Sequence, residues 1–120
     1  MVGKAGTLVV IRGNSGSGKS TTAIEVQQRF GRGTCAVVAQ DVVLVATTPH
    51  ALFYSFDLTL DQTLIRHAGR PLAASIPEST MRQWYRGWQP LPFVDEVRID
   101  ADWSLDAIVD RIYRDVVAVR

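Results

Sequence analysis

Short apolar runs and helically spaced apolar residues alternate along the first third of the chain. Residues 8–11 (LVVI) and 35–39 (CAVVA) are continuous apolar runs, the pattern of strands buried on both faces of a parallel sheet. Between them, apolar residues recur at helical spacing: Ala23, Val26 and Phe30. A strand, a helix and a second strand in this order predict an α/β fold with a mostly parallel sheet.

The middle of the chain predicts a third strand and a second helix. Residues 51–56 form another apolar run, and a capping box, Thr59-x-x-Gln62, follows it. The helix predicted after the box carries an apolar stripe: Leu60, Leu64, Ile65 and Ala68. Gly69 supplies a stop signal for this helix.

The last third predicts two helices with a strand between them. A second capping box, Ser75-x-x-Glu78, opens the first of these helices. The segment 96–119 begins as a strand and continues as a helix after Ser104, a suitable N-cap. This final helix carries a long apolar stripe: Leu105, Ile108, Val109, Ile112, Val116 and Val119.

Residues 13–20 (GNSGSGKS) join the first predicted strand to the first predicted helix and fit the pattern G-x-x-x-x-G-K-[ST]. This strand–loop–helix setting is the structural context of a phosphate-binding loop. A glycine-rich turn without a ligand does not need a Lys-Ser pair at its end, so the motif predicts a nucleoside triphosphate site. The predicted cofactor-binding residues are Gly13, Asn14, Ser15, Gly16, Ser17, Gly18, Lys19, Ser20 and Thr21.

Each residue type in the motif has a role in phosphate binding. Glycines let the backbone turn so that successive N–H groups point at phosphate oxygens. The positive end of the following helix adds to the attraction. Lys19 is placed to contact the β- and γ-phosphates and to take part in catalysis, and the Ser20 hydroxyl is placed to bind Mg²⁺. ATP and Mg²⁺ are therefore the expected cofactors.

Composition and charge narrow the class of partner. The chain has 120 residues, enough for one domain, and 47% of them are hydrophobic. A formal net charge of +1 gives no electrostatic reason to expect nucleic acid or an anionic membrane as a partner. No apolar run approaches the ~20 residues that span a bilayer. A single cysteine, Cys35, fits a reducing, cytoplasmic location.

Candidate catalytic residues outside the loop lie at the ends of predicted elements. Asp41 follows the second apolar run, at the edge where open α/β sheets bind ligands, and could accept a proton from a substrate hydroxyl. A solvated strand end or a helix N-cap explains Asp41 equally well. Arg66 and Arg70 lie four residues apart near a helix end. They either neutralise charge on a transferring phosphoryl group or only complement the helix dipole.

An aromatic and basic segment follows these arginines. Its aromatic and arginine residues interleave: Arg82, Trp84, Tyr85, Arg86 and Trp88. Interleaving of this kind occurs in proteins that bind single-stranded nucleic acid, but the near-zero net charge favours helix packing or a lid. Trp103, in the loop before the last helix, lies either against an adenine ring or at the edge of the core.

The order of these pieces resembles the small-molecule kinases of the P-loop class related to adenylate kinase, gluconate kinase, chloramphenicol phosphotransferase and zeta toxins. The matching stretches are VVIRGNSGSGKSTTA, VVAQD, YSFDLTLDQTLIRHAGRP, MRQWYRGWQPLPF and RIDADWSLDAIVDRI. The resemblance implies a P-loop NTPase fold with three α/β/α layers and transfer of the ATP γ-phosphate to a small hydroxyl acceptor. It gives Asp41 the place of the strand-two aspartate that meets the substrate, and gives Arg66 and Arg70 the places of arginines flanking a lid. The loop 100–104 takes the adenine side.

The chain departs from this family between Gln40 and Asp57. Parallel strands need a crossover of about a dozen residues or more, usually a helix, and the stretch between the apolar runs is too short to contain one. Relatives place a helix, a central strand and another helix there, and this block shapes the acceptor pocket. We therefore expect a single kinase-like domain, residues 1–120, that lacks the usual acceptor-binding segment.

Two arrangements of the shortened chain are open. Relatives have the strand order 2-3-1-4-5, so strand two can move beside strand one to give a sheet of about four strands. Alternatively, residues 42–46 pair antiparallel with residues 51–56. Either arrangement exposes apolar surface, which predicts self-association as a homo-oligomer or marginal stability.

Two functional classes follow from these observations. The first is an ATP-dependent kinase acting on a small hydroxyl acceptor. The second is a nucleotide-binding remnant or interaction module without efficient phosphotransfer. The acceptor is not identified, because the segment that would shape its pocket is the missing one.

Overall fold

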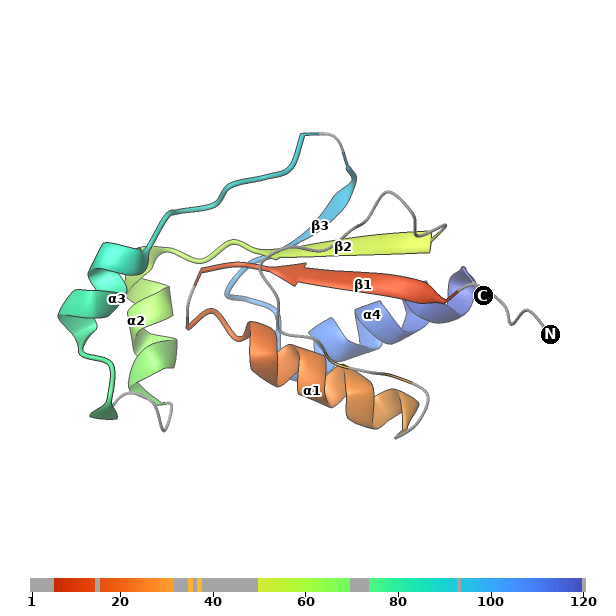
Figure 1. The fold of residues 1–120 in the computed structure, drawn as a ribbon, viewed down its shortest axis with the longest axis horizontal. Helices are drawn as coiled ribbons and strands as arrows, with labels where there is room; N and C mark the ends of the chain where they lie inside the picture. The colour runs from red at the N-terminus through yellow and green to blue at the C-terminus, as the bar shows by residue number, and fades with distance from the viewer. Residues whose placement is uncertain are drawn as a thin grey trace.

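Three parallel strands form the sheet in the part of the chain that the computed structural model describes, residues 6–14, 16–31, 35, 37, 50–69, 74–92 and 94–119 (Figure 1). They are β1 (Thr7–Arg12), β2 (His50–Phe56) and β3 (Glu96–Ile99), in the order β1-β2-β3. Both pairings are parallel, with Ile11 opposite Tyr54 and Tyr54 opposite Val97. The predicted α/β class and parallel sheet are confirmed at this level.

Four helices accompany the sheet in the same ranges: α1 (Lys19–Phe30), α2 (Leu60–Ala68), α3 (Glu78–Trp84) and α4 (Leu105–Ala118). α1 and α4 lie along one face of the sheet, whereas α2 and α3 lie beyond the carboxyl ends of the strands (Figure 1). None of these helices is long and apolar enough to cross a membrane.

The core lies between the sheet and the helical layer of α1 and α4. Alternation along β2 turns Tyr54 and Phe56 to this side, and both are buried. The remaining buried members come from the two helices and β3: Val26, Ile99, Ile108, Val109, Ile112 and Val116. The predicted stripe of the last helix is confirmed for its central residues, while Leu105 at its start is 37% exposed.

Local capping signals set two of the helix starts. Thr59 Oγ1 accepts from the Gln62 backbone N–H at 3.1 Å, and Gln62 Oε1 accepts from the Thr59 N–H at 2.9 Å, so the predicted capping box is formed. Ser104 caps α4 by accepting from the Ala107 N–H. The box predicted at Ser75 is wrong. Pro77 adopts extended backbone, with φ −65° and ψ 155°, and α3 begins only after it, at Glu78.

The apolar stripe predicted for α2 is confirmed in part: Leu60 and Leu64 are half-buried, whereas Ala68 is exposed. Ile65 is 74% exposed, and the buried residues of this helix are Thr63 and His67. Thr63 Oγ1 donates to the Thr59 carbonyl, and His67 Nε2 lies 2.8 Å from the Ile76 carbonyl oxygen, while His67 Nδ1 is buried without a hydrogen-bond partner among the described residues. α2 therefore packs with a partly polar face and leaves Ile65 exposed to solvent.

Residues 85–91, which we call the strap, run from α3 back along the sheet toward β3 (Figure 1). The Tyr85 hydroxyl donates to the Leu58 carbonyl at 2.7 Å, and the Trp88 indole N–H donates to Ser55 Oγ at 3.1 Å. Ser55 alternates with the core residues Tyr54 and Phe56 along β2, so the strap lies on the sheet face opposite α1 and α4.

The predicted sheet of about four strands is described in part. β1 neighbours β2, and β2 neighbours β3, as expected for strands 1, 4 and 5 of the order 2-3-1-4-5. Of the run 35–39, only Cys35 and Val37 are described, and neither is in a strand. Residues 42–46, with the alternative antiparallel pairing, lie outside the described residues. The P-loop NTPase fold and its third layer stay predictions.

Candidate phosphate-binding site

The loop between β1 and α1 bends at two glycines. Gly16 and Gly18 have φ values of 83° and 109°, in a region that residues with a side chain rarely adopt. Gly18 is the N-cap of α1, and the Ser17 backbone N–H donates to the Asn14 carbonyl at 3.1 Å to close the preceding turn. Predicted loop residue Ser15 lies outside the described residues. The glycine spacing read from the sequence thus coincides with the turns that bring the chain into α1.

Gly13 is required at the end of β1 by close packing. A Cβ atom at this position would lie 2.7 Å from Ser17 Oγ and 2.9 Å from Phe56 Cβ, closer than atoms can approach. Ser17 is only 1% exposed, and its Oγ has no hydrogen-bond partner among the described residues. The loop is therefore pressed against β2, and its position is fixed by the sheet.

Lys19 turns back over the loop from the first residue of α1. Its Nζ donates to the Gly13 carbonyl oxygen at 2.5 Å and to the Asn14 carbonyl oxygen at 3.3 Å. The ammonium group therefore lies beside the backbone that the motif predicts to hold phosphate. Carbonyl oxygens are neutral acceptors, and a phosphate oxygen forms stronger, charge-assisted hydrogen bonds with an ammonium group.

Arg66 reaches the same loop from α2. Its Nη1 donates to the Ser17 carbonyl oxygen at 2.7 Å, and a Cβ atom placed on Gly18 would lie 3.4 Å from Nη1. The structure thus brings Arg66 to the loop, and its contact with a phosphoryl group stays a prediction. Its predicted companion Arg70 lies outside the described residues, as does the candidate base Asp41.

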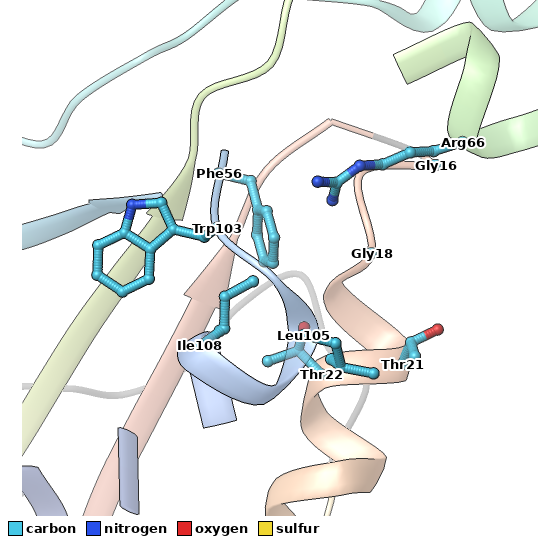
Figure 2. Close-up of a pocket in the computed structure, with 9 residues that line it drawn as sticks. All are labelled: Gly16, Gly18, Thr21, Thr22, Phe56, Arg66, Trp103, Leu105 and Ile108. Carbon is cyan, nitrogen blue, oxygen red and sulfur yellow. The ribbon is translucent and has the colours of Figure 1, made fainter. Parts of the chain in front are cut away.

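A pocket of about 260 Å³ opens beside the loop (Figure 2). Its lining residues come from the loop, α1, β2, α2 and the start of α4: Gly16, Gly18, Thr21, Thr22, Phe56, Arg66, Trp103, Leu105 and Ile108. The Arg66 guanidinium extends over the loop on one side, and Trp103 lies on the opposite side (Figure 2). The pocket therefore offers a cationic, glycine-rich end and an apolar end with an indole ring.

Several lining residues were not identified from the sequence. The apolar pattern places Phe56 in a strand and Leu105 and Ile108 in a helical stripe, and it gives Thr22 no role. The signal that could have identified them is position: Phe56 ends β2, and Leu105 begins the helix that follows β3. In open α/β sheets the carboxyl ends of strands are where ligands bind.

The predicted Mg²⁺ ligand Ser20 is the second residue of α1 and is exposed. Among the residues that the structure describes, no group of three or more His, Cys, Asp or Glu side chains could hold a metal ion. A single hydroxyl beside a phosphate site nevertheless fits Mg²⁺, which retains several waters and takes further oxygen ligands from nucleotide phosphates. Ser20 is the described residue that would hold the ion.

Two cationic side chains and the start of a helix of 12 residues converge on one loop. This arrangement favours an anion, because unpaired N–H groups and the helix dipole add to the charges of Lys19 and Arg66.

Comparisons with protein-family models, curated proteins and solved structures found no match to this chain.

Proposed function

We propose that the chain binds a nucleoside triphosphate, with ATP and Mg²⁺ as the expected ligands, at the loop 13–20. The observation that carries the proposal is the convergence of Lys19 and Arg66 on carbonyl oxygens of this loop, at 2.5 Å and 2.7 Å. Phosphate oxygens are stronger partners than neutral carbonyls for both cations, so a bound triphosphate would replace these contacts.

The shape of the pocket supports an orientation for the nucleotide. Phosphates lie along the loop, next to the Lys19 ammonium and the Arg66 guanidinium. The adenine ring lies at the other end, against Trp103, because an indole ring stacks favourably on a purine. Ser20 would hold Mg²⁺, which when bound neutralises charge on the β- and γ-phosphates.

The proposed reaction is transfer of the γ-phosphate to a small hydroxyl acceptor. The acceptor oxygen bonds to the γ-phosphorus, the bond from that phosphorus to the β–γ bridging oxygen breaks, and ADP leaves. Lys19, Arg66 and Arg70 stabilise the charge on the transferring group, and Asp41 accepts the proton of the acceptor hydroxyl. This assignment comes from the resemblance to small-molecule kinases.

A second candidate function is nucleotide binding without efficient transfer. The polar side chains in the described lining of the pocket are those of Thr21, Thr22 and Arg66. These groups can bind a nucleotide, but none of them is a carboxylate that could act as the base for an acceptor hydroxyl. The segment between Gln40 and Asp57 is too short to contain the acceptor-binding block of the kinases that the chain resembles, which also argues against efficient transfer.

Thermal unfolding measured over a range of Mg-ATP concentrations tests the proposal. A ligand that binds only the folded state raises the melting temperature progressively with its concentration. Mg-ADP and magnesium tripolyphosphate, measured in parallel, separate the contributions of the base and the phosphates. A melting temperature that does not change at millimolar Mg-ATP would overturn both the kinase and the nucleotide-binding proposals.

A further inference from the structure

Asn14 links the phosphate-binding loop to the strap through both polar groups of its side-chain amide. Its Nδ2 donates to the Gly87 carbonyl oxygen at 2.9 Å, and its Oδ1 accepts from the Arg86 backbone N–H at 2.6 Å. An amide that donates and accepts on one backbone stretch fixes both the position and the direction of that stretch. The contact joins residues more than 70 positions apart in the sequence.

The main chain of Asn14 takes part in the loop itself. Its carbonyl oxygen accepts from the Ser17 N–H at 3.1 Å and from Lys19 Nζ at 3.3 Å. One residue therefore holds the strap with its side chain, and holds the loop turn and the Lys19 ammonium with its backbone. A displacement of the strap would move this carbonyl, and with it the phosphate-binding groups.

The strap is anchored independently next to Asn14. Arg12, two residues earlier, donates to the Gln89 carbonyl oxygen at 2.7 Å and forms an ion pair with Glu96. Glu96 Oε1 also accepts from the Leu91 backbone N–H at 2.8 Å. Because the Glu96 side chain is only 5% exposed, its contacts with Arg12 and Leu91 are shielded from water, which strengthens them, whereas the Arg12–Gln89 hydrogen bond is exposed. The strap thus offers a fixed support against which Asn14 can hold the loop.

We propose that Asn14 is a positioning residue for triphosphate binding, which uses the strap to hold the loop in its binding conformation. The inference rests on the proposed function, because it concerns the same loop. Both polar groups of the amide bind the strap, so its effect on phosphate passes through the backbone of the loop. The strap accordingly contributes to nucleotide affinity without touching the nucleotide.

A double-mutant cycle between Asn14 and Gly87 tests this inference. Asn14→Ala removes both hydrogen bonds. Gly87→Ala strains the strap at the contact, since Gly87 has a φ of 72°, but a Cβ atom there meets nothing within 4 Å. We expect each change to weaken Mg-ATP affinity about tenfold, as the loss of one to two hydrogen bonds implies. The double variant should be no weaker than Asn14→Ala alone, because both changes break one connection.

Two results of the cycle would overturn the inference. Unchanged affinity in Asn14→Ala would show that the tether does not support the loop. Fully additive losses would show that Asn14 acts independently of the strap. Arg82→Ala is the matched control, because Arg82 lies on α3 just before the strap and pairs with the exposed side chain of Glu78. The Mg-ATP affinity of this variant should equal that of the unmodified chain.

Amide hydrogen exchange without nucleotide gives a second readout. Both variants should exchange faster in residues 13–20, while exchange in α4 stays unchanged, since only the tether is lost. Unchanged exchange in the loop would overturn the tether even if nucleotide binding is observed. An unmodified chain that binds no Mg-ATP would instead overturn the proposed function, and the role of the tether in affinity with it.

Discussion

Arg66 donates a 2.7 Å hydrogen bond from Nη1 to the carbonyl oxygen of Ser17, across 49 residues of sequence. The contact brings a guanidinium group from α2 to the loop that also holds the Lys19 ammonium. Ser17 itself is buried against Gly13 and β2, so the position of its carbonyl is fixed. Arg66 therefore lines the pocket with its guanidinium held at the loop (Figure 2).

Arg66→Ala should reduce phosphoryl transfer far more than it reduces ATP binding. If Arg66 stabilises charge that develops on the transferring group, its loss lowers kcat by about a hundredfold, as for other preorganised donors. The affinity for Mg-ATP, measured by calorimetry, should fall only several-fold. Equal losses in binding and turnover would indicate simple contacts with the phosphates of bound ATP. Arg114→Ala on α4, remote from the loop, is the control for charge.

Lys19→Ala should abolish measurable nucleotide binding. Two charged hydrogen bonds to phosphate oxygens contribute about 1.5–3 kcal/mol each, so their loss weakens affinity by a hundredfold or more. Calorimetry with Mg-ATP provides the measurement, and an unchanged affinity would refute the assignment of the loop.

Trp103→Ala separates the two roles open to this residue. If the indole stacks on adenine, ATP affinity falls by about 1–3 kcal/mol, whereas affinity for tripolyphosphate stays the same. Trp103 also packs against the core cluster, so the melting temperature should fall in either case. Trp103→Phe keeps an aromatic ring and should restore most of the ATP affinity. Loss of stability alone, with ATP affinity intact, would leave Trp103 as a core-edge residue.

The stability of the fold should decrease at high pH because of Tyr54. Burial, and then the hydrogen bond from its hydroxyl to Asp115 at 2.7 Å, raise the pKa of Tyr54 well above its ordinary value of 10.0. Above about pH 10 the unfolded chain loses this proton while the folded chain keeps it, so stability falls by up to about 1.4 kcal/mol per pH unit. Below that pH the hydroxyl is protonated in both states and adds no pH dependence.

The free energy of unfolding, measured in denaturant between pH 8 and 11, checks this expectation. Tyr54→Phe should remove part of the high-pH decrease, and the difference between the two chains should grow only above about pH 10. Tyr113→Phe, which changes a half-buried tyrosine on α4, is the matched control. Parallel pH profiles for the unmodified chain and Tyr54→Phe would contradict the assignment.

The chain should bind Mg-ATP and yet be a poor kinase. Binding needs only the contiguous β1–loop–α1 unit, whereas transfer needs an acceptor hydroxyl in line with the γ-phosphate, about 3 Å away. By the resemblance to small-molecule kinases, the segment that would shape the acceptor site is shortened, and a displacement of ~1 Å can cost on the order of a hundredfold in rate. Slow hydrolysis of ATP is therefore expected. Transfer of labelled γ-phosphate to a panel of sugars, nucleosides and hydroxylated antibiotics provides the assay, and rapid turnover on any of them would refute the expectation.

The sequence by itself determined the features that depend on neighbours along the chain. The glycine spacing in residues 13–20 identified the turns at Gly16 and Gly18 and the start of α1. The predicted capping box at Thr59 and N-cap at Ser104 are confirmed, because a capping hydrogen bond joins residues only three apart. The parallel α/β class followed from the alternation of apolar runs with helically spaced segments.

Only the tertiary structure decided which distant residues meet at the site. Arg66 reaches Ser17, Asn14 is held by the strap, and Trp103 faces Arg66 across the pocket, because the parallel sheet brings the carboxyl ends of its strands together. It also decided the orientation of α2, where the hydrogen bonds of Thr63 and His67 allowed polar side chains to be buried in place of Ile65. Local spacing does not specify such contacts, because they depend on how separate segments pack against one another.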